Sequence, residues 1–88
     1  MNSTTAARVR MIIAEYFKVQ PGDILNQSRF RDLGADWVDL INLFLMIENR
    51  LPELQASKLV VGQIETVRDL LLALIDLSAR AKRSALVN

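Results

Sequence analysis

The sequence predicts a single all-α domain over residues 1–88. Apolar residues recur at helical spacing in three segments, and no segment alternates between apolar and polar residues as a strand does. The two prolines and three glycines fall where these helices should stop. With 51% hydrophobic residues and a net charge of +1, the chain can form one packed core, and its length leaves no room for a second.

The composition excludes several classes of protein. Because the chain has no cysteine and no histidine, it lacks disulfides, thiolate metal ligands, the usual zinc ligand and the usual general base. We therefore expect a protein that is not an enzyme and holds no metal. The longest apolar run, residues 70–75, is too short to cross a bilayer, which takes ~20 residues. Residues 1–7 lack the apolar core of a signal peptide, so we expect a cytoplasmic domain without a membrane span.

The first predicted helix spans residues 5–19. Its apolar residues recur about one turn apart and are Val9, Ile12, Ile13, Tyr16 and Phe17. The hydroxyl residues 3–5 are alternative N-caps, and the Pro-Gly-Asp turn at residues 21–23 ends the helix.

Residues 20–35 are predicted to form a long loop that is pinned across the core. Its apolar anchors are Ile24, Leu25, Phe30 and Leu33. Arg29 and Arg31 are expected to pair with Asp32 or to meet an acidic partner.

The second predicted helix spans residues 37–50. Asp36 is its expected N-cap, and Asp39 adds a carboxylate near the positive end of the helix dipole. We favour this capping role over paired-carboxylate catalysis. The apolar residues cover roughly 220° of the helix, about twice what packing on one side needs. They are Trp37, Val38, Leu40, Ile41, Leu43, Phe44, Leu45, Ile47 and Leu51. Part of this helix is therefore expected to offer a second apolar surface.

The remainder of the chain predicts short turns and one more helix. Residues 53–62 should hold one or two turns, with Leu54, Leu59, Val60 and Val61 packing inward. The last helix should begin after Thr66, with Asp69 completing a capping box, and end near residue 81. Its expected core face consists of Val67, Leu70, Leu71, Leu74 and Leu77. Residues 80–88 form a basic tail that is predicted to fray.

A known motif begins at Phe30. The chain reads Phe-Arg-Asp-Leu-Gly-Ala-Asp over residues 30–36 and resembles the acyl carrier protein family, whose members have a phenylalanine and then D-L-G-A-D-S-L-D here. The motif residues around the expected site are Leu33, Gly34, Ala35, Asp36, Val38, Asp39 and Leu40. The resemblance covers a core of about residues 5–77. It implies a four-helix bundle with three longer helices and a short third helix.

The chain departs from the family pattern at one position. The resemblance implies that a serine directly after Asp36 carries a 4'-phosphopantetheine arm, but the chain has Trp37 there. An indole N–H donates a hydrogen bond and offers no nucleophilic oxygen. We therefore expect no prosthetic group on this sequence, and 4'-phosphopantetheine only if position 37 were serine. Ser28, Ser57 and Ser78 lie outside the motif and are not expected to substitute.

Trp37 has three readings from the sequence. It can cover apolar surface beside Ile41 and Phe44, anchor a protein interface, or stand where a serine has been altered. A natural serine-less paralogue and a substituted carrier are equally compatible with the sequence.

The resemblance also implies that the second helix docks on enzymes through acidic residues. Here several of the matching positions hold residues that are not acidic, namely Asn42, Asn49 and Arg50. Docking should therefore depend more on apolar contact. The predicted partner-binding surface consists of Trp37, Val38, Ile41, Leu45 and Glu48. Its expected partners are acyl-transfer or synthase enzymes, or a second copy of the chain. Nucleic acid is not expected, because no aromatic residues are interleaved with the basic tail.

These features predict an acyl carrier protein-like protein of fatty acid, polyketide or related lipid biosynthesis that acts by non-covalent contact. The alternative is an adaptor or regulator that keeps the bundle and has lost acyl transport. Binding to a phosphopantetheinyl transferase or a ketosynthase would favour the carrier lineage, whereas binding only to unrelated proteins would favour the adaptor.

Overall fold

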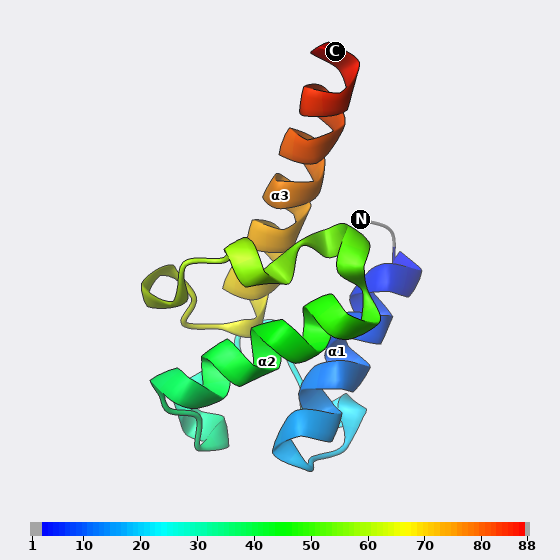
Figure 1. The fold of residues 1–88 in the computed structure, drawn as a ribbon. Coiled ribbons are helices and arrows are strands. Elements are labelled where there is room, and N and C mark those ends of the chain that lie inside the picture. Colours follow the sequence, from blue (N-terminus) through cyan, green and yellow to red (C-terminus); the bar gives the residue numbers. More distant parts are fainter. Residues whose placement is uncertain (1–2, 88) are drawn as a thin grey trace.

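The computed structural model describes residues 3–87 and confirms the all-α prediction (Figure 1). The three α-helices are α1 (Ser3–Phe17), α2 (Trp37–Arg50) and α3 (Val67–Val87). Residues 3–87 contain no strand, and the only bridge recorded in them joins Arg29 to Thr66. The helices α1 and α2 pack with the first half of α3, and the rest of α3 extends beyond the bundle (Figure 1).

The core is built from apolar side chains that the helices and connecting segments turn inward. The helices contribute Val9, Ile12, Ile13, Ala14, Leu40, Leu43, Phe44, Ile47, Val67, Leu70 and Leu74. The connecting segments contribute Ile24, Phe30, Leu51, Leu54, Ala56 and Ile64. Within residues 3–82, whose side chains are described, no polar or charged residue is buried. Burial of apolar surface therefore stabilises this core without the cost of a desolvated charge.

The helix α1 ends at Phe17 rather than at the predicted Val19. Lys18 adopts the left-handed conformation with φ 59°, which no regular helix continues through. The backbone N–H of Val19 then donates to the carbonyl of Ala14 at 3.0 Å, the hydrogen bond of a Schellman motif. At the other end, the predicted caps at residues 3–5 lie in the first turn of α1, and the position before that turn is outside the described residues.

Two of the four predicted anchor residues in the loop after α1 are fully buried. Ile24 and Phe30 are buried, and Leu33 is half-buried against the core. Leu25 is 51% exposed, so the prediction that it is an anchor is wrong. Ile24 follows the 3-10 turn η1 (Pro21–Asp23) in extended backbone, where neighbouring side chains point to opposite sides. Burial of Ile24 therefore turns Leu25 outward.

Hydrogen bonds tie this loop to both α1 and α3. Arg10 of α1 donates to the carbonyl of Ile24 at 3.0 Å and to the side chain of Asn26. The backbone N–H of Val67, the first residue of α3, donates to the carbonyl of Ser28 at 3.0 Å. These bonds hold the part of the loop that leads into α2.

Between α2 and α3, 3-10 turns take the place of the short third helix. They are η3 (Pro52–Leu54), η4 (Ala56–Lys58) and η5 (Val61–Gln63). Leu54 is buried as predicted, and Leu59 and Val61 are half-buried against the core. Val60 is 58% exposed, so the prediction that it packs inward is wrong. Leu59 and Val60 have extended backbone, which turns their side chains to opposite sides.

The start of α3 is confirmed by its capping hydrogen bonds. The backbone N–H of Asp69 donates to Thr66 Oγ1 at 3.1 Å, and the backbone N–H of Thr66 donates to Asp69 Oδ2 at 2.9 Å. This reciprocal pair is a capping box with aspartate in place of glutamate. Of the predicted core face, Val67 and the leucines at positions 70 and 74 are buried, and those at 71 and 77 are half-buried.

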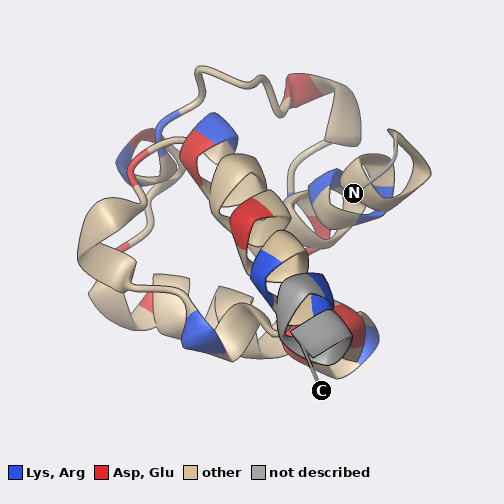
Figure 2. Ribbon diagram, turned by 90° about the horizontal axis from the view of Figure 1, so that it is seen from above, with Lys and Arg blue, Asp and Glu red and all other residues tan. Residues whose placement is uncertain are grey.

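The helix α3 continues to Val87, so the prediction that it ends near residue 81 is wrong, whereas the fraying of the basic tail stays a prediction. This stretch contains no glycine or proline, and Arg80 donates to Asp76 one turn earlier at 2.8 Å. Residue 88 lies outside the described residues. Acidic and basic residues both lie along α3 (Figure 2). Among residues 3–87, no helix combines the length and apolar character that spanning a membrane requires.

Candidate functional site

The predicted site lies at the first turn of α2, where a capping box sets the start of the helix. The backbone N–H of Asp39 donates to Asp36 Oδ1 at 2.8 Å, and the backbone N–H of Asp36 donates to Asp39 Oδ2 at 3.1 Å. Asp36 has extended backbone, as an N-cap requires. Both carboxylates thus satisfy backbone donors at the helix start, which confirms the capping role predicted for them.

A side chain of α1 holds this first turn from the other side. The Tyr16 hydroxyl donates to Asp39 Oδ1 at 3.0 Å. The hydrogen bond from the Asp36 backbone N–H, followed by that from Tyr16, holds the pKa of the Asp39 carboxyl below its ordinary value. Burial, followed by the hydrogen bond to Asp39, raises the pKa of Tyr16. The start of α2 is therefore held in place by contacts on both sides of the capping box.

The chain enters α2 through a turn that requires glycine. The 3-10 turn η2 (Phe30–Leu33) ends at Gly34, whose φ of 86° lies in the left-handed region. The backbone N–H of Ala35 reaches back to the carbonyl of Phe30 at 3.1 Å. With Phe30 buried and Ala35 half-buried, this turn sets the direction in which Asp36 begins the helix.

Trp37 is the first residue of α2 and is 68% exposed. Trp37 is therefore not a core residue, and its covering of apolar surface beside Ile41 and Phe44 stays a prediction. The side chain that covers this part of the core is Leu40, which is buried one turn further on. The indole is left available to a partner.

A hollow of about 380 Å³ lies beside Trp37. It is lined by Phe30, Arg31, Ala35, Asp36, Trp37, Leu40, Val61, Gly62, Ile64 and Glu65. The last four of these lie in or just after η5, far from α2 in the sequence. No local sequence pattern predicts that these four residues lie at the site, because only the packing of η5 beside α2 brings them there.

The remaining predicted surface residues divide into two groups. Val38, Ile41 and Leu45 are 60%, 41% and 52% exposed, so α2 does present a second apolar face. Glu48 is half-buried and accepts a hydrogen bond from Ser57 Oγ at 2.6 Å. The Glu48 carboxylate therefore already has a hydrogen-bond partner within the chain. The side chains of Val38, Ile41 and Leu45 make no hydrogen bond that a partner protein would have to break.

The loop arginines pair with a different residue from the one predicted. Arg29 and Arg31 approach Glu65 at 3.8 Å and 3.7 Å, and no ion pair with Asp32 is recorded. The backbone N–H of Phe30 donates to the Glu65 carbonyl at 3.0 Å, which brings Glu65 beside both arginines. The sequence could not show this, because Glu65 lies more than thirty positions away along the chain.

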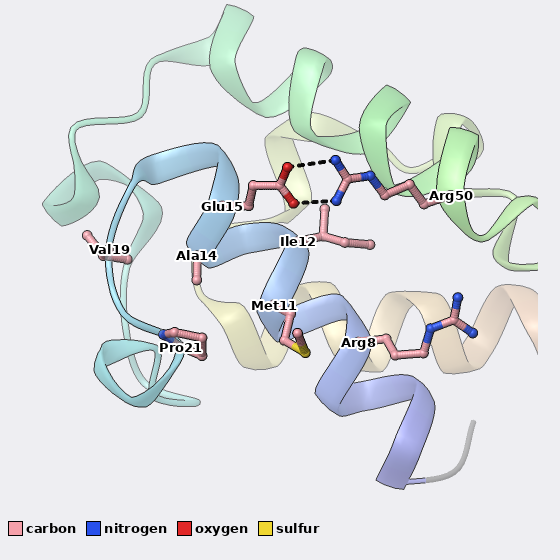
Figure 3. Close-up of a pocket in the computed structure, with 8 residues that line it drawn as sticks. All are labelled: Arg8, Met11, Ile12, Ala14, Glu15, Val19, Pro21 and Arg50. Carbon is pink, nitrogen blue, oxygen red and sulfur yellow. Dashed lines mark hydrogen bonds and ion pairs between the residues drawn. The ribbon is translucent and has the colours of Figure 1, made fainter.

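A separate hollow of about 450 Å³ lies between α1, the loop after it and the end of α2 (Figure 3). Its lining residues are Arg8, Met11, Ile12, Ala14, Glu15, Val19, Pro21 and Arg50. Arg50 donates to Glu15 through both guanidinium N–H₂ groups, one of them at 2.8 Å. These hydrogen bonds lower the pKa of Glu15 and raise that of Arg50. None of the predicted site residues lines this hollow.

The fold and the first turn of α2 define a helical carrier domain of the kind expected from residues 30–40. The family model for the phosphopantetheine attachment site matches residues 7–74, which is more than half of the chain. The chain therefore belongs to this family, in accordance with its resemblance to acyl carrier proteins. No solved structure matches the chain.

Membership of this family has consequences at a coarse level. Its domains serve as carrier proteins in biosynthesis, normally bear 4'-phosphopantetheine after modification, contact partner enzymes and are not themselves catalytic. The residue that begins α2 in this chain has no hydroxyl, because it is Trp37. Attachment of a phosphodiester to this side chain therefore does not fit its chemistry.

Proposed function

We propose that this chain is a carrier-family protein that acts by non-covalent protein contact and bears no 4'-phosphopantetheine at residue 37. Its partners in this proposal are acyl-transfer or synthase enzymes of fatty acid, polyketide or related lipid biosynthesis. The single observation that carries the proposal is Trp37 itself, which is the exposed first residue of a normally capped helix.

The geometry around Trp37 is that of an intact helix start. It therefore supports a non-covalent function and not the loss of the site through misfolding. The capping box, the tie to Tyr16 and the left-handed Gly34 are all in place. The helix therefore still presents its first residue outward. Only the nucleophilic oxygen is missing, and an aromatic side chain suited to interface contact stands there instead.

Ser28, Ser57 and Ser78 offer no equivalent of the missing hydroxyl. Ser28 Oγ accepts a hydrogen bond from the backbone N–H of Leu25 at 3.0 Å, and Ser57 Oγ donates to Glu48. Ser78 lies within α3 and is half-buried. None of the three begins an α-helix, where unpaired backbone N–H groups and the dipole favour an anion.

A second candidate is an ordinary carrier in which tryptophan has replaced serine at position 37. The intact capping box favours it, because the helix start is retained without the group that it would orient. In that case Trp37→Ser restores a hydroxyl at the first residue of α2. The adaptor, which would have no role in acyl metabolism, has the same fold. It differs from the non-covalent carrier-family protein and from the substituted carrier in the partners that it binds.

The test is incubation with coenzyme A and a phosphopantetheinyl transferase of broad specificity, followed by intact-mass measurement. We expect the wild-type chain to keep its mass, whereas a gain of one phosphopantetheine by Trp37→Ser is the result that the substituted carrier predicts. Trp37→Ala is the matched control, since it removes the indole without supplying an oxygen. A phosphopantetheine gain by the wild-type chain would overturn the proposal, and peptide mapping would locate the modified residue.

The outcome for Trp37→Ser separates the two candidates. Modification of this variant shows that a single residue blocks loading and favours the substituted carrier. An unmodified Trp37→Ser shows that the site has diverged beyond position 37 and favours a natural non-covalent protein. The mass of the chain isolated from its source cells then decides whether tryptophan is the residue present in the cell.

A further inference from the structure

The hollow between α1, the loop after it and the end of α2 differs in chemistry at its two ends (Figure 3). Val19 and Pro21 lie at one end, whereas Arg8 lies at the other and extends away from them. Met11 and Ile12 lie on α1 between the two ends. A molecule with an apolar tail and a charged head therefore has one favoured orientation in this hollow.

The apolar part of the lining is continuous with the core. Ile12 and Ala14 are buried, and Val19 is half-buried against the core. Met11 is 59% exposed, and its flexible thioether side chain can adjust to the shape of a ligand. A hydrocarbon tail that covers these side chains removes apolar surface from water, which favours binding.

The charged part of the lining leaves one cation in excess. Two arginines and one glutamate line the hollow, and Arg50 donates to both carboxylate oxygens of Glu15. This pair neutralises itself. The guanidinium of Arg8 makes no ion pair or hydrogen bond with any residue whose side chain the structure describes. An anion with a single charge therefore complements this hollow better than a neutral or cationic molecule.

The size of the hollow indicates a small molecule. Its volume of about 450 Å³ lies in the range of ~300–1,000 Å³ that is usual for small-molecule sites. From Arg8 to Ala14 the helix α1 rises by about 9 Å, roughly the length of an extended eight-carbon chain. The dimensions and the charge together specify a medium-length tail with one anionic head.

We propose that this hollow binds a small amphipathic carboxylate with an unbranched hydrocarbon tail of about eight carbons. The carboxylate pairs with Arg8. The tail lies over Met11 and extends toward Val19 and Pro21. Nothing else in the lining has to move its charge, because the pair between α1 and the end of α2 stays intact.

This site is separate from the predicted site at Trp37. Arg50 is the last residue of α2 and Trp37 is the first, so the two sites lie about 20 Å apart along the helix. The proposal therefore goes beyond the proposed function and does not depend on it.

The expected affinity is low. The ligand is small, and Arg8 is exposed, so water screens its ion pair with the carboxylate. We expect a dissociation constant on the order of 1 mM for octanoate. Added salt should weaken binding further, because it screens exposed charges.

The test is titration of the full, isotope-labelled chain with octanoate, followed through the backbone amide signals in NMR spectra. We expect saturable shifts within residues 8–21, whereas the indole N–H signal of Trp37 stays unchanged. Octanol lacks the charge, octylammonium reverses it and acetate lacks the tail, so each should bind at least about tenfold more weakly. Shifts centred on Trp37, or octanol binding as tightly as octanoate, would overturn the proposal.

Three variants test the role of the charges. Arg8→Gln should weaken octanoate binding about tenfold, because the carboxylate loses its cation. Glu15→Gln should strengthen it about threefold, because Arg50 then has no carboxylate partner within the hollow. Lys58→Gln in η4 removes the same charge as Arg8→Gln outside the lining and should leave binding unchanged. The amide spectrum of each variant without ligand checks that it folds. Equal binding by Arg8→Gln and Lys58→Gln would contradict the assignment of the carboxylate to Arg8.

The two proposals fail in different experiments. A wild-type chain that octanoate does not shift and that the transferase does not load overturns only the carboxylate site. A wild-type chain that is loaded overturns the proposed function, whether or not it binds octanoate.

Discussion

The starts of α2 and α3 use the same local chemistry and end in opposite environments. Each has a capping box closed by an aspartate three residues after the cap, Asp36 with Asp39 and Thr66 with Asp69. The first helical residue after the cap is Trp37 in α2, which is 68% exposed, and Val67 in α3, which is fully buried.

The difference lies in what packs beside each helix start. The start of α3 is covered by the loop after α1, whose Phe30 N–H and Ser28 carbonyl bond to Glu65 and Val67. The start of α2 contacts Tyr16 and η5, but neither covers its first residue, so Trp37 remains exposed. A capping box decides where a helix begins, whereas the surrounding chain decides whether that beginning is core or surface.

The two helix starts should differ most in how much stability is lost when the first helical residue is replaced with alanine. Val67→Ala should lower the free energy of unfolding by about 2 kcal/mol, because a fully buried side chain is lost. Trp37→Ala should change it by less than about 0.5 kcal/mol, as for exposed positions in general. Urea unfolding at low protein concentration measures both without a contribution from self-association. Equal losses for the two variants would contradict the contrast in burial.

Removal of the caps should have a smaller effect, equal at the two helices. Asp36→Ala and Thr66→Ala should each lower the free energy of unfolding by about 1 kcal/mol, since a backbone N–H loses its acceptor. Asp36→Asn and Thr66→Ser, which keep an acceptor oxygen, are the matched controls and should cost less. If only one of the two alanine variants destabilises the chain, the two helix starts are not locally equivalent.

The smallest expected effect is on acid titration. Hydrogen bonds from the Thr66 and then the Glu65 backbone N–H lower the pKa of Asp69, as those from Asp36 and Tyr16 lower that of Asp39. Both carboxylates therefore stabilise the fold above the ordinary aspartate pKa of about 3.9, and this contribution is lost as the pH falls through the lowered values. Tyr16→Phe should raise the pKa of Asp39 toward its ordinary value. NMR titration of the side-chain carboxyls measures this shift.

Asp69 serves as the internal control in that titration. Tyr16 is not among the groups that shift the pKa of Asp69, so that pKa should be unchanged in Tyr16→Phe. A shift of both residues, or of neither, would contradict the assignment of the Tyr16 hydrogen bond to the capping box of α2.

Much of the fold was accessible from local patterns. The bounds of α2 agree with the predicted residues 37–50, because a capping aspartate and the residues before Pro52 mark both ends. The end of α1 was missed, because Lys18 adopts a left-handed conformation that glycine normally marks. The prediction of inward packing failed at Leu25 and Val60, where each exposed residue follows an inward-facing neighbour in extended backbone.

The candidate site was accessible only in part. The motif and the apolar excess on α2 are local, so the exposed face at Trp37, Ile41 and Leu45 could be anticipated. The hollow beside Trp37 could not, because Val61 and Ile64 reach it through a connection of turns. The partner of the loop arginines could not either, because backbone pairing across the fold selects Glu65 over the adjacent Asp32.

The helical class, the two capped helix starts and the absence of a hydroxyl at residue 37 can be derived from the amino-acid sequence alone. These properties follow from residue identity and short-range hydrogen bonding, which act within a turn of helix. The exposure of Trp37, the burial of Val67 and a recess beside Leu45 depend instead on tertiary packing. Burial depends on which distant segments pack together, and the same apolar side chain serves as core or as interface according to what covers it.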